Sequence, residues 1–459
     1  MFKERERNGD DQGEFWVRRS ELPKAAAGAF YRKLDDTLDK IGFADGVRDI
    51  CRPAYADAAA GGRPGIDPAV YFKMLMIGFF ENLPSERSIA SRCADSLSLR
   101  VFLGYDVTED TPDHSSLSVI RSRLGTEVYQ AALELVLVGL YEHGLLKGEA
   151  LGIDSSIIEA NASLRELRHR NTEKSYWDYV KELAAEAGID PDDTKAVRRF
   201  DKKRKGRKTS NQEWSNPHDP DAKVGRTKGG AYDMVYKPEH LTDLETGAII
   251  RAEVREGDAG DSVDLSLRVM DACYTLARTC EDPGHQRTGQ SLTTDEGYFG
   301  VEEVCCLQAE GLRTVMGDPH ASRRRKDEPC KTTRAVLRRA RQAVSSKSGK
   351  ALLRKRGEHL ERSFAHVLHH GGLRRATLRG IENLTKRQIA AAMTYDLSLL
   401  MRKLFGHGTP KQWLACGLFG LKRWLMGLVE AIMGKPERYR AVSTNRSHQF
   451  GLFALEAQG

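Results

Sequence analysis

Two short apolar runs, each closed by an aspartate, constrain this chain more than any other feature. The run LGID ends at Asp154, and the run SLTTD ends at Asp295. Apolar runs of this length suit strands that are buried in the middle of a sheet. A glutamate, Glu361, lies in a helix-like segment rich in arginine and lysine. Three carboxylates brought together in one site could hold two divalent cations against a phosphodiester.

Hydrophobic periodicity and turn residues predict an all-helical N-terminal part, followed by strands and helices in alternation. The predicted helices cover 70–81, 85–104, 111–125, 126–145, 263–277 and 300–309, and the predicted strands cover 150–158, 232–236, 248–254, 291–295 and 312–316. Thr111, Pro112 and Asp113 predict a helix start, and Asp261 with Ser262 predicts a helix cap. This order predicts an α/β fold with a mixed sheet flanked by helices.

The same reading predicts three domains. Residues 1–145 would form a helical N-terminal domain for DNA binding or multimerisation, and 146–405 a catalytic domain. A basic insertion at about 160–230 is expected to lie on the surface and to be partly mobile. Residues 406–459 would form a helical tail. Short helices that end in a basic one suit a helix-turn-helix-like unit, although a plain oligomerisation bundle fits the same pattern.

Composition limits the class of protein. Forty per cent hydrophobic and 30% charged residues in a chain of 459 describe a soluble globular protein with two or three domains. A net charge of +7 with clustered positive residues favours an anionic partner such as nucleic acid. The eight cysteines contain no C-x-x-C pair, so free thiols in a reducing cytoplasm are expected. No phosphate-binding loop motif is present, and ATP use is not expected.

One apolar stretch, 413–433, is long enough to be a candidate membrane span. It contains Lys422, Arg423 and Glu430, and charges near a bilayer centre are expensive. The stretch therefore predicts an apolar helix packed on the protein, and no membrane partner is expected.

Clusters of lysine and arginine are candidate phosphate contacts. Each such contact would raise the salt sensitivity of DNA binding, whereas the alternative for any one cluster is a solvated surface. The candidate DNA-binding residues are Arg121, Arg123, Arg198, Arg199, Lys202, Lys203, Arg204, Arg338, Arg339, Arg354, Arg356 and Arg362. Trp177, Trp214 and Tyr232 could stack on a frayed base, but core packing is the favoured interpretation.

Several blocks, in this order and spacing, resemble the DDE transposases of bacterial insertion sequences, in the InsH-like group (insertion-sequence-five and eleven-eighty-two relatives). The third block begins GEHLERSF and contains Glu361, and the second is TDEGY around Asp295. Each block alone is a weak signal, but together they cover most of the chain. The blocks are 62–104, 112–124, 152–170, 294–298, 357–387 and 401–411.

The resemblance implies a ribonuclease-H-like fold in which Asp154, Asp295 and Glu361 form the catalytic, metal-binding triad. It implies Mg²⁺ or Mn²⁺ as cofactor, with two ions. The implied partners are double-stranded DNA, as terminal inverted repeats and target, and further copies of the chain in a homodimer or higher multimer. The implied location is a bacterial cytoplasm, in association with the nucleoid.

The chain departs from the pattern around the third carboxylate. Many relatives carry Tyr and Arg four and seven residues before the glutamate and Lys seven after it, whereas Arg354, Gly357 and Leu368 stand there in this chain. Glu358 is the alternative third ligand. Two other functions also fit the sequence: a degenerate transposase that binds terminal repeats without cutting, and a metal-dependent nuclease without strand transfer.

Overall fold

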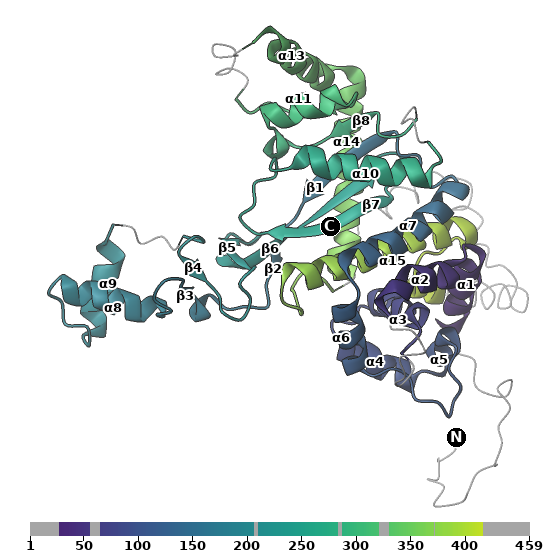
Figure 1. Cartoon of the computed structure of the whole chain (residues 1–459), viewed down its shortest axis with the longest axis horizontal. Helices are drawn as coiled ribbons and strands as arrows, with labels where there is room; N and C mark the ends of the chain where they lie inside the picture. Colours follow the sequence, from purple (N-terminus) through teal and green to yellow (C-terminus); the bar gives the residue numbers. More distant parts are fainter. Residues whose placement is uncertain are drawn as a thin grey trace, which may run out of the picture. The chain divides into compact units, whose positions relative to one another are not determined.

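The computed structural model describes residues 27–55, 65–205, 210–282, 287–320, 330–370 and 372–415 (Figure 1). The chain divides into two compact units. One consists of Met1–Phe30 with Pro410–Gly459, and in its described part the rings of Phe30 and Trp413 meet edge to face with centroids 6.1 Å apart. The second unit, Tyr31–Thr409, holds the sheet and all of the predicted catalytic residues.

Every described element before the first strand is helical, as predicted. These elements are α1 (Ala27–Lys40), α2 (Phe43–Cys51), η1 (Arg52–Ala54), α3 (Pro68–Phe80), α4 (Glu86–Asp95), α5 (Leu97–Leu103), α6 (His114–Arg123) and α7 (Thr126–Glu142). From Tyr31 onward they belong to the same compact unit as the sheet. The predicted domain boundary near residue 145 therefore stays a prediction.

Local capping corrects two of the helix predictions. The helix predicted over 85–104 is two helices, because Ser96 has an extended backbone and its side chain accepts the Leu99 N–H at the start of α5. Helix α6 starts after Asp113, whose carboxylate accepts the Ser116 N–H, and not at Thr111. In both places a short polar side chain satisfies a free N–H group at the start of a helix.

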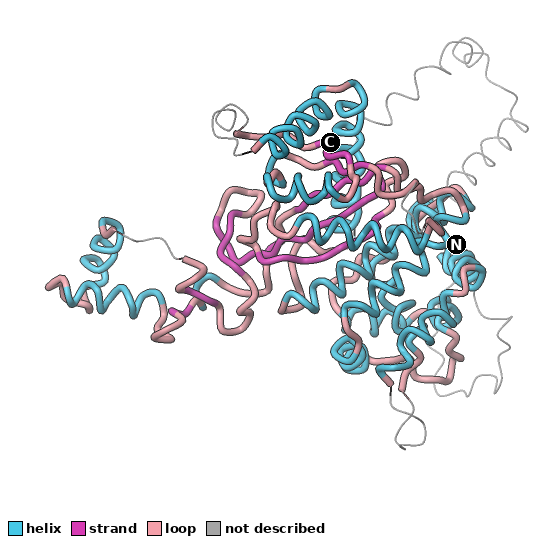
Figure 2. The backbone as a smooth tube through the Cα atoms, turned by 45° about the horizontal axis from the view of Figure 1, so that its top comes forward, coloured by secondary structure: helices cyan, strands magenta, loops and turns pink. Residues whose placement is uncertain are grey.

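The mixed sheet predicted from the sequence is present. Its strands are β1 (Ala150–Ser155), β2 (Ile158–Glu159), β5 (Lys223–Arg226), β6 (Tyr232–Asp243), β7 (Ile249–Glu256), β8 (Ser291–Thr293) and β9 (Arg313–Val315). The order is β2-β6-β1-β8-β9, and β5 and β7 pair with the other edge of β6. Strand β1 is antiparallel to β6 and parallel to β8. Figure 2 shows the strands of the sheet in magenta with helices in cyan beside them. The predicted hairpin is β6–β7.

Strand β7 lies at the edge of the sheet, and the long helix α15 (Ile381–Phe405) packs against it. The N–H of Val254 donates to Thr385 Oγ1 at 3.1 Å, and the N–H of Ile249 donates to the buried carboxylate of Asp396 at 3.0 Å. Side chains of α15 thus satisfy donors that a bare edge strand would leave unpaired.

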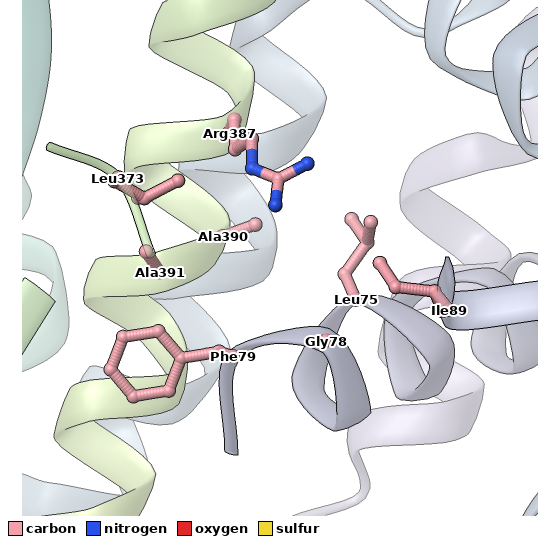
Figure 3. Close-up of a pocket in the computed structure, with 8 residues that line it drawn as sticks. All are labelled: Leu75, Gly78, Phe79, Ile89, Leu373, Arg387, Ala390 and Ala391. Carbon is pink, nitrogen blue, oxygen red and sulfur yellow. The ribbon is translucent and has the colours of Figure 1, made fainter. Parts of the chain in front are cut away.

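Helix α15 also packs against the N-terminal helices. The guanidinium of Arg387 is partly buried and donates to the carbonyl of Leu83 at 3.1 Å. Figure 3 shows it directed into a cavity of about 30 Å³ lined mainly by apolar side chains of α3, α4 and α15. Burial lowers the pKa of Arg387, although this cation keeps its charge at any ordinary pH.

In the described part of the chain between the hairpin and α15 lie the α-helices α10 (Leu265–Thr279), α11 (Val301–Ala309), α13 (Lys331–Ser345) and α14 (Lys347–Phe364). Asp261 and Ser262 do not cap α10 as predicted, because the helix begins at Leu265 after Asp264 in a left-handed conformation. Helix α14 packs on β1, where Gly152 leaves room for it. A Cβ at Gly152 would lie 3.3 Å from Leu360 Cδ1 and 2.4 Å from Leu244 Cδ2.

The basic insertion contains more regular structure than predicted. It holds a short ribbon of β3 (Arg168–His169) and β4 (Trp214–Ser215), with α8 (Tyr176–Glu186) and α9 (Thr194–Lys203) between the two strands. Trp214 is buried among Tyr176, Tyr179 and His169, so its predicted core role is confirmed. The same prediction is wrong for Trp177 and Tyr232, which are exposed.

The predicted apolar helix at 413–433 lies almost wholly outside the described residues, which end at 415. Among the residues that the structure describes, no helix is long and apolar enough to cross a membrane.

Candidate active site

Asp154 and Asp295 come together at the ends of two neighbouring parallel strands. Gly152 of β1 pairs with Thr293 of β8, and each aspartate comes two residues later. Because side chains on a strand repeat every second residue, equal steps from a paired position bring both aspartates to the same level. The two carboxylates therefore lie at the same edge of the sheet, and their shared role in a site stays a prediction.

Arg356 of α14 joins the two aspartates. Its Nη2 lies 2.9 Å from Asp154 Oδ2 and 3.6 Å from Asp295 Oδ2. This arginine is one of the candidate DNA contacts, and its guanidinium lies between the two carboxylates. A cation between two carboxylates lowers the repulsion that they would otherwise feel.

The environment of Asp154 opposes its ionisation. Its side chain is 24% exposed, and burial raises its pKa to about 6. Arg356 and the Ser155 N–H act in the opposite direction, while the charges of Asp295 and Asp261 raise the pKa further. A cation added beside this carboxyl group would lower its pKa, because each positive charge nearby favours the ionised form.

Asp261 is a third acidic group near this site, and the sequence analysis did not identify it. Its carboxylate accepts the Ser155 hydroxyl at 3.0 Å and pairs with Lys237 Nζ at 3.0 Å. A Cβ on Gly297 would lie 3.1 Å from Asp261 Oδ2 and 3.4 Å from Asp295 Oδ1. Gly297 of the TDEGY block thus lies between two carboxylates, where a side chain would disturb both.

A buried ionic layer supports the site. The hydroxyl of Tyr298, also from the TDEGY block, donates to Glu239 Oε2 at 2.7 Å, and Arg268 lies 3.2 Å from Glu239 Oε1. Burial raises the pKa of Glu239 to about 7, while Arg268 and the Tyr298 hydroxyl counter that effect. Glu239 is the β6 partner of Ser155. The tyrosine of the motif therefore attaches the Asp295 turn to β6.

Glu361 does not join the two aspartates in this structure. It is exposed on α14, and no hydrogen bond or ion pair connects it with Asp154 or Asp295. Glu358, the alternative ligand, pairs with Arg362 at 2.6 Å. Within the described ranges, no group of three or more His, Cys, Asp or Glu side chains is arranged to hold a metal ion.

Ser363 and Phe364, the last two residues of the ERSF motif, attach α14 to the sheet. Ser363 Oγ lies 3.0 Å from His240 Nδ1, and the ring of Phe364 stacks on His240 with centroids 4.3 Å apart. His240 is fully buried, burial lowers its pKa to about 3, and it is the β6 partner of Asp154. Apart from its glutamate, the motif therefore has a structural role, because it attaches the helix that carries Arg356 to β6.

The oxygen donors present fit a divalent cation in part. Mg²⁺ prefers carboxylate oxygens, uses one or two of them and keeps several waters. Asp154 and Asp295 supply such a pair, and Arg356 already shows that a positive charge fits between them. Whether two ions bind, with Glu361 as the third ligand, stays a prediction.

Two of the candidate DNA contacts form ion pairs within the chain. Arg121 is 13% exposed, pairs with Glu86 and donates to Asn383 Oδ1 at 3.1 Å. Arg204 donates to Asp201 at 2.7 Å and is 11% exposed. Basic residues in a run look alike in the sequence, and only the packed structure separates buried from free ones.

The other candidates occupy exposed or partly exposed positions. Arg123 lies over the ring of Tyr55, with its guanidinium carbon 4.7 Å from the ring centroid. The exposed candidates are Arg198, Arg199, Lys202 and Lys203 on α9, Arg338 and Arg339 on α13, and Arg354 and Arg362 on α14. Their exposure is compatible with phosphate contact and does not test it.

Comparison with known proteins adds one finding to this geometry. Residues 19–123 match a family described as transposase domain (DUF772). No match is found among curated proteins or among solved structures. The matched region carries helices α1 to α6 and ends before the strand that bears Asp154. The N-terminal helices therefore resemble a transposase domain, and this match supports a transposase, a DNA-cleaving enzyme in general terms.

Proposed function

We propose that the chain is a DDE transposase of the InsH-like type, which cuts and joins DNA at the ends of an insertion sequence by metal-dependent phosphodiester transfer. The observation that carries the proposal is the meeting of Asp154 and Asp295 at Arg356, at the ends of neighbouring parallel strands. The transposase-domain match in the preceding helices supports the same class of substrate. The mixed sheet with α14 packed on β1 is compatible with a ribonuclease-H-like core.

The carboxylates and the arginine of the site have different roles in this reaction. Asp154 and Asp295 would hold Mg²⁺ or Mn²⁺, with Glu361 as the third ligand on the strength of its motif. The metal, when bound, would act as a Lewis acid and lower the pKa of a coordinated water or hydroxyl. Arg356, released from the carboxylates, is positioned to pair with a phosphate oxygen, for which a guanidinium fork is well suited.

The supporting residues keep this arrangement in place. Lys237 and Ser155 hold Asp261 beside the two ligands, and Tyr298 anchors the Asp295 turn to Glu239. Partners that orient a metal ligand commonly matter for affinity almost as much as the ligand itself. No general-base side chain is required, because a bound metal would lower the pKa of the water or DNA 3′-hydroxyl that attacks at this site. Double-stranded DNA ends, target DNA and a second copy of the chain are the proposed partners.

The test is cleavage of DNA that contains an end of the element encoding the chain. Purified protein is incubated with the labelled fragment in Mg²⁺ or EDTA, beside Asp295→Asn and the matched variant Asp271→Asn, which changes a largely exposed aspartate on α10. Metal-dependent nicking that is lost only in Asp295→Asn supports the proposal. Cleavage retained by Asp295→Asn contradicts it. Joining of a pre-cut 3′-hydroxyl end to a second duplex separates a transposase from a simple nuclease.

A further inference from the structure

The α8–α9 hairpin inside the basic insertion has a hydrophobic core of its own. Val180 and Ala184 of α8 are fully buried against Val197 of α9. The side chains of Tyr176, Ile189 and Phe200 pack around them. Figure 1 shows the two helices connected to the rest of the chain through the β3–β4 ribbon. The hairpin therefore has the internal packing needed to present a surface of fixed shape.

Hydrogen bonds and an ion pair connect the two helices of this hairpin beside its hydrophobic core. The hydroxyl of Tyr176 donates to Asp201 Oδ1 at 2.9 Å, and Arg204 Nε donates to the same oxygen at 2.7 Å. Asp201 is buried, so its charge is neutralised within the hairpin. One face of α9, with Val197, Asp201 and Arg204, is thus committed to internal packing.

The opposite face of α9 carries only positive charge. At about 100° per residue, five cations fall within an arc of about 140° around the helix. All are exposed, and they are Lys195, Arg198, Arg199, Lys202 and Lys203. None of them forms an ion pair within the described residues. Two acids of the hairpin pair with lysines outside this face: Glu182 with Lys174, and Asp192 with Lys181 at 3.8 Å.

Five unpaired cations on a helix of ten residues repel one another at spacings of three and four. An anion bound along this face would remove that repulsion. Arg198 lies over the ring of Trp177, which is 46% exposed, with its guanidinium carbon 5.9 Å from the ring centroid. The flat indole thereby orients one of the cations at the border of the charged face.

We propose that this face of α9 is a docking surface for the phosphate backbone of duplex DNA, separate from the site that cuts it. The cations from Lys195 to Lys203 extend over about 12 Å of helix axis, a length over which duplex DNA carries about seven phosphates. A convex helix offers no enclosure for a small anion, whereas it fits an extended row of charges. The choice of DNA as the polyanion rests on the proposed function.

The docking surface holds DNA without reading its sequence. Lysine and arginine contacts with phosphate fix position and orientation, and base identity is read by contacts with base edges. The hairpin is inserted between β1 and β5, on the same catalytic core as Asp154. Its expected effect is therefore on affinity and salt dependence for any duplex, and not on the chemical step at a short fragment.

The test compares two double variants of the full-length chain with equal changes in net charge. Lys195→Gln with Arg199→Gln removes two cations from the proposed surface, and Lys174→Gln with Lys181→Gln removes two from α8 and its approach. Binding to a random-sequence duplex is measured in EDTA over a range of salt concentrations. Each lost phosphate contact lowers the slope of log affinity against log salt by about 0.9, so the α9 pair should lower it by up to about 1.8. The control pair should leave it near the wild-type value.

An unchanged slope in the α9 pair, or equal loss in both pairs, overturns the docking surface. Thermal unfolding of each variant checks that the hairpin still folds. Because binding is measured in EDTA, the result does not depend on cleavage. Nicking of a short end fragment, followed separately in Mg²⁺, tests the proposed function. If the α9 variant shows the predicted slope change but the wild type never nicks, the transposase proposal fails and the docking surface stands.

Discussion

The guanidinium of Arg356 lies 2.9 Å from the carboxylate of Asp154. Arg356 is on α14, the helix that also carries Glu361 of the ERSF motif. The same Nη2 reaches Asp295 at 3.6 Å. An arginine that would be assigned to DNA from the sequence thus serves as the counter-charge of the two predicted metal ligands. A metal ion bound by the two aspartates would take the place of this guanidinium.

Replacing Arg356 with alanine should destabilise the chain in EDTA by about 2 kcal/mol, because a largely buried carboxylate loses its partner. Adding Mg²⁺ should restore part of that loss, since the ion can take the place of the guanidinium. The free energy of unfolding from urea titrations, with and without Mg²⁺, measures both effects. Arg362→Ala, which breaks an exposed pair with Glu358, should cost no more than about 0.5 kcal/mol. Equal behaviour of the two variants would contradict the counter-charge role.

Asp154→Asn should leave stability at pH 7 unchanged or raise it, while cleavage is lost. Burial raises the folded-state pKa of Asp154 to about 6, above its unfolded value near 4. The folded chain thus binds more protons than the unfolded chain between those values, so ionisation of Asp154 costs stability as pH rises. Urea unfolding of the variant and wild type at pH 4, 5, 6 and 7 should show a difference that grows toward pH 6. A variant less stable than wild type at every pH would refute this account of Asp154.

Burial of His240 should change the free energy of unfolding in the opposite direction at lower pH. Burial lowers its pKa to about 3, so the folded chain binds fewer protons than the unfolded chain between about pH 6.5 and 3. Its contribution to stability should therefore be lost as pH falls, by up to about 1.4 kcal/mol per pH unit. His240→Gln should flatten this acid slope, while His114→Gln, at an exposed position, should preserve it. An unchanged slope in His240→Gln would show that the imidazole is not held neutral.

Asp261→Asn should slow metal-dependent cleavage about 10- to 100-fold, because Asp261 holds Ser155 and Lys237 beside the two ligands. Asp264→Asn is the control, since asparagine tolerates the left-handed backbone that Asp264 adopts at φ 56°. The rate of nicking at saturating Mg²⁺ is the measurement. Equal rates for the Asp261 variant and wild type would remove Asp261 from the site.

The strands and their carboxylates could be predicted from the sequence because local patterns determine them. Apolar runs gave β1, β8 and β9, and the turn between Asp243 and Gly247 gave the β6–β7 hairpin. The meeting of Asp154 with Asp295 then depends only on β1 and β8 being parallel neighbours.

What the sequence could not provide depends on contacts between distant segments. Asp261 reaches the site through its bonds to Ser155 and to Lys237 of β6, and no local pattern marks it. The small core of the α8–α9 hairpin is hidden in a segment whose composition is polar and basic. Arg121 looks like an exposed helix cation until Glu86, on a neighbouring helix, pairs with it.

The most direct test of the central claim is the binding of Mn²⁺, followed by electron paramagnetic resonance, to the wild type, Asp154→Asn, Asp295→Asn and the control Asp271→Asn. If Asp154 and Asp295 share one cation, either substitution should weaken binding at least tenfold, and a variant that carries both substitutions should be little worse than either single one. The control should bind as the wild type does. Binding of equal strength in the wild type and in both aspartate variants would contradict the account, because the two carboxylates would then not be the metal ligands.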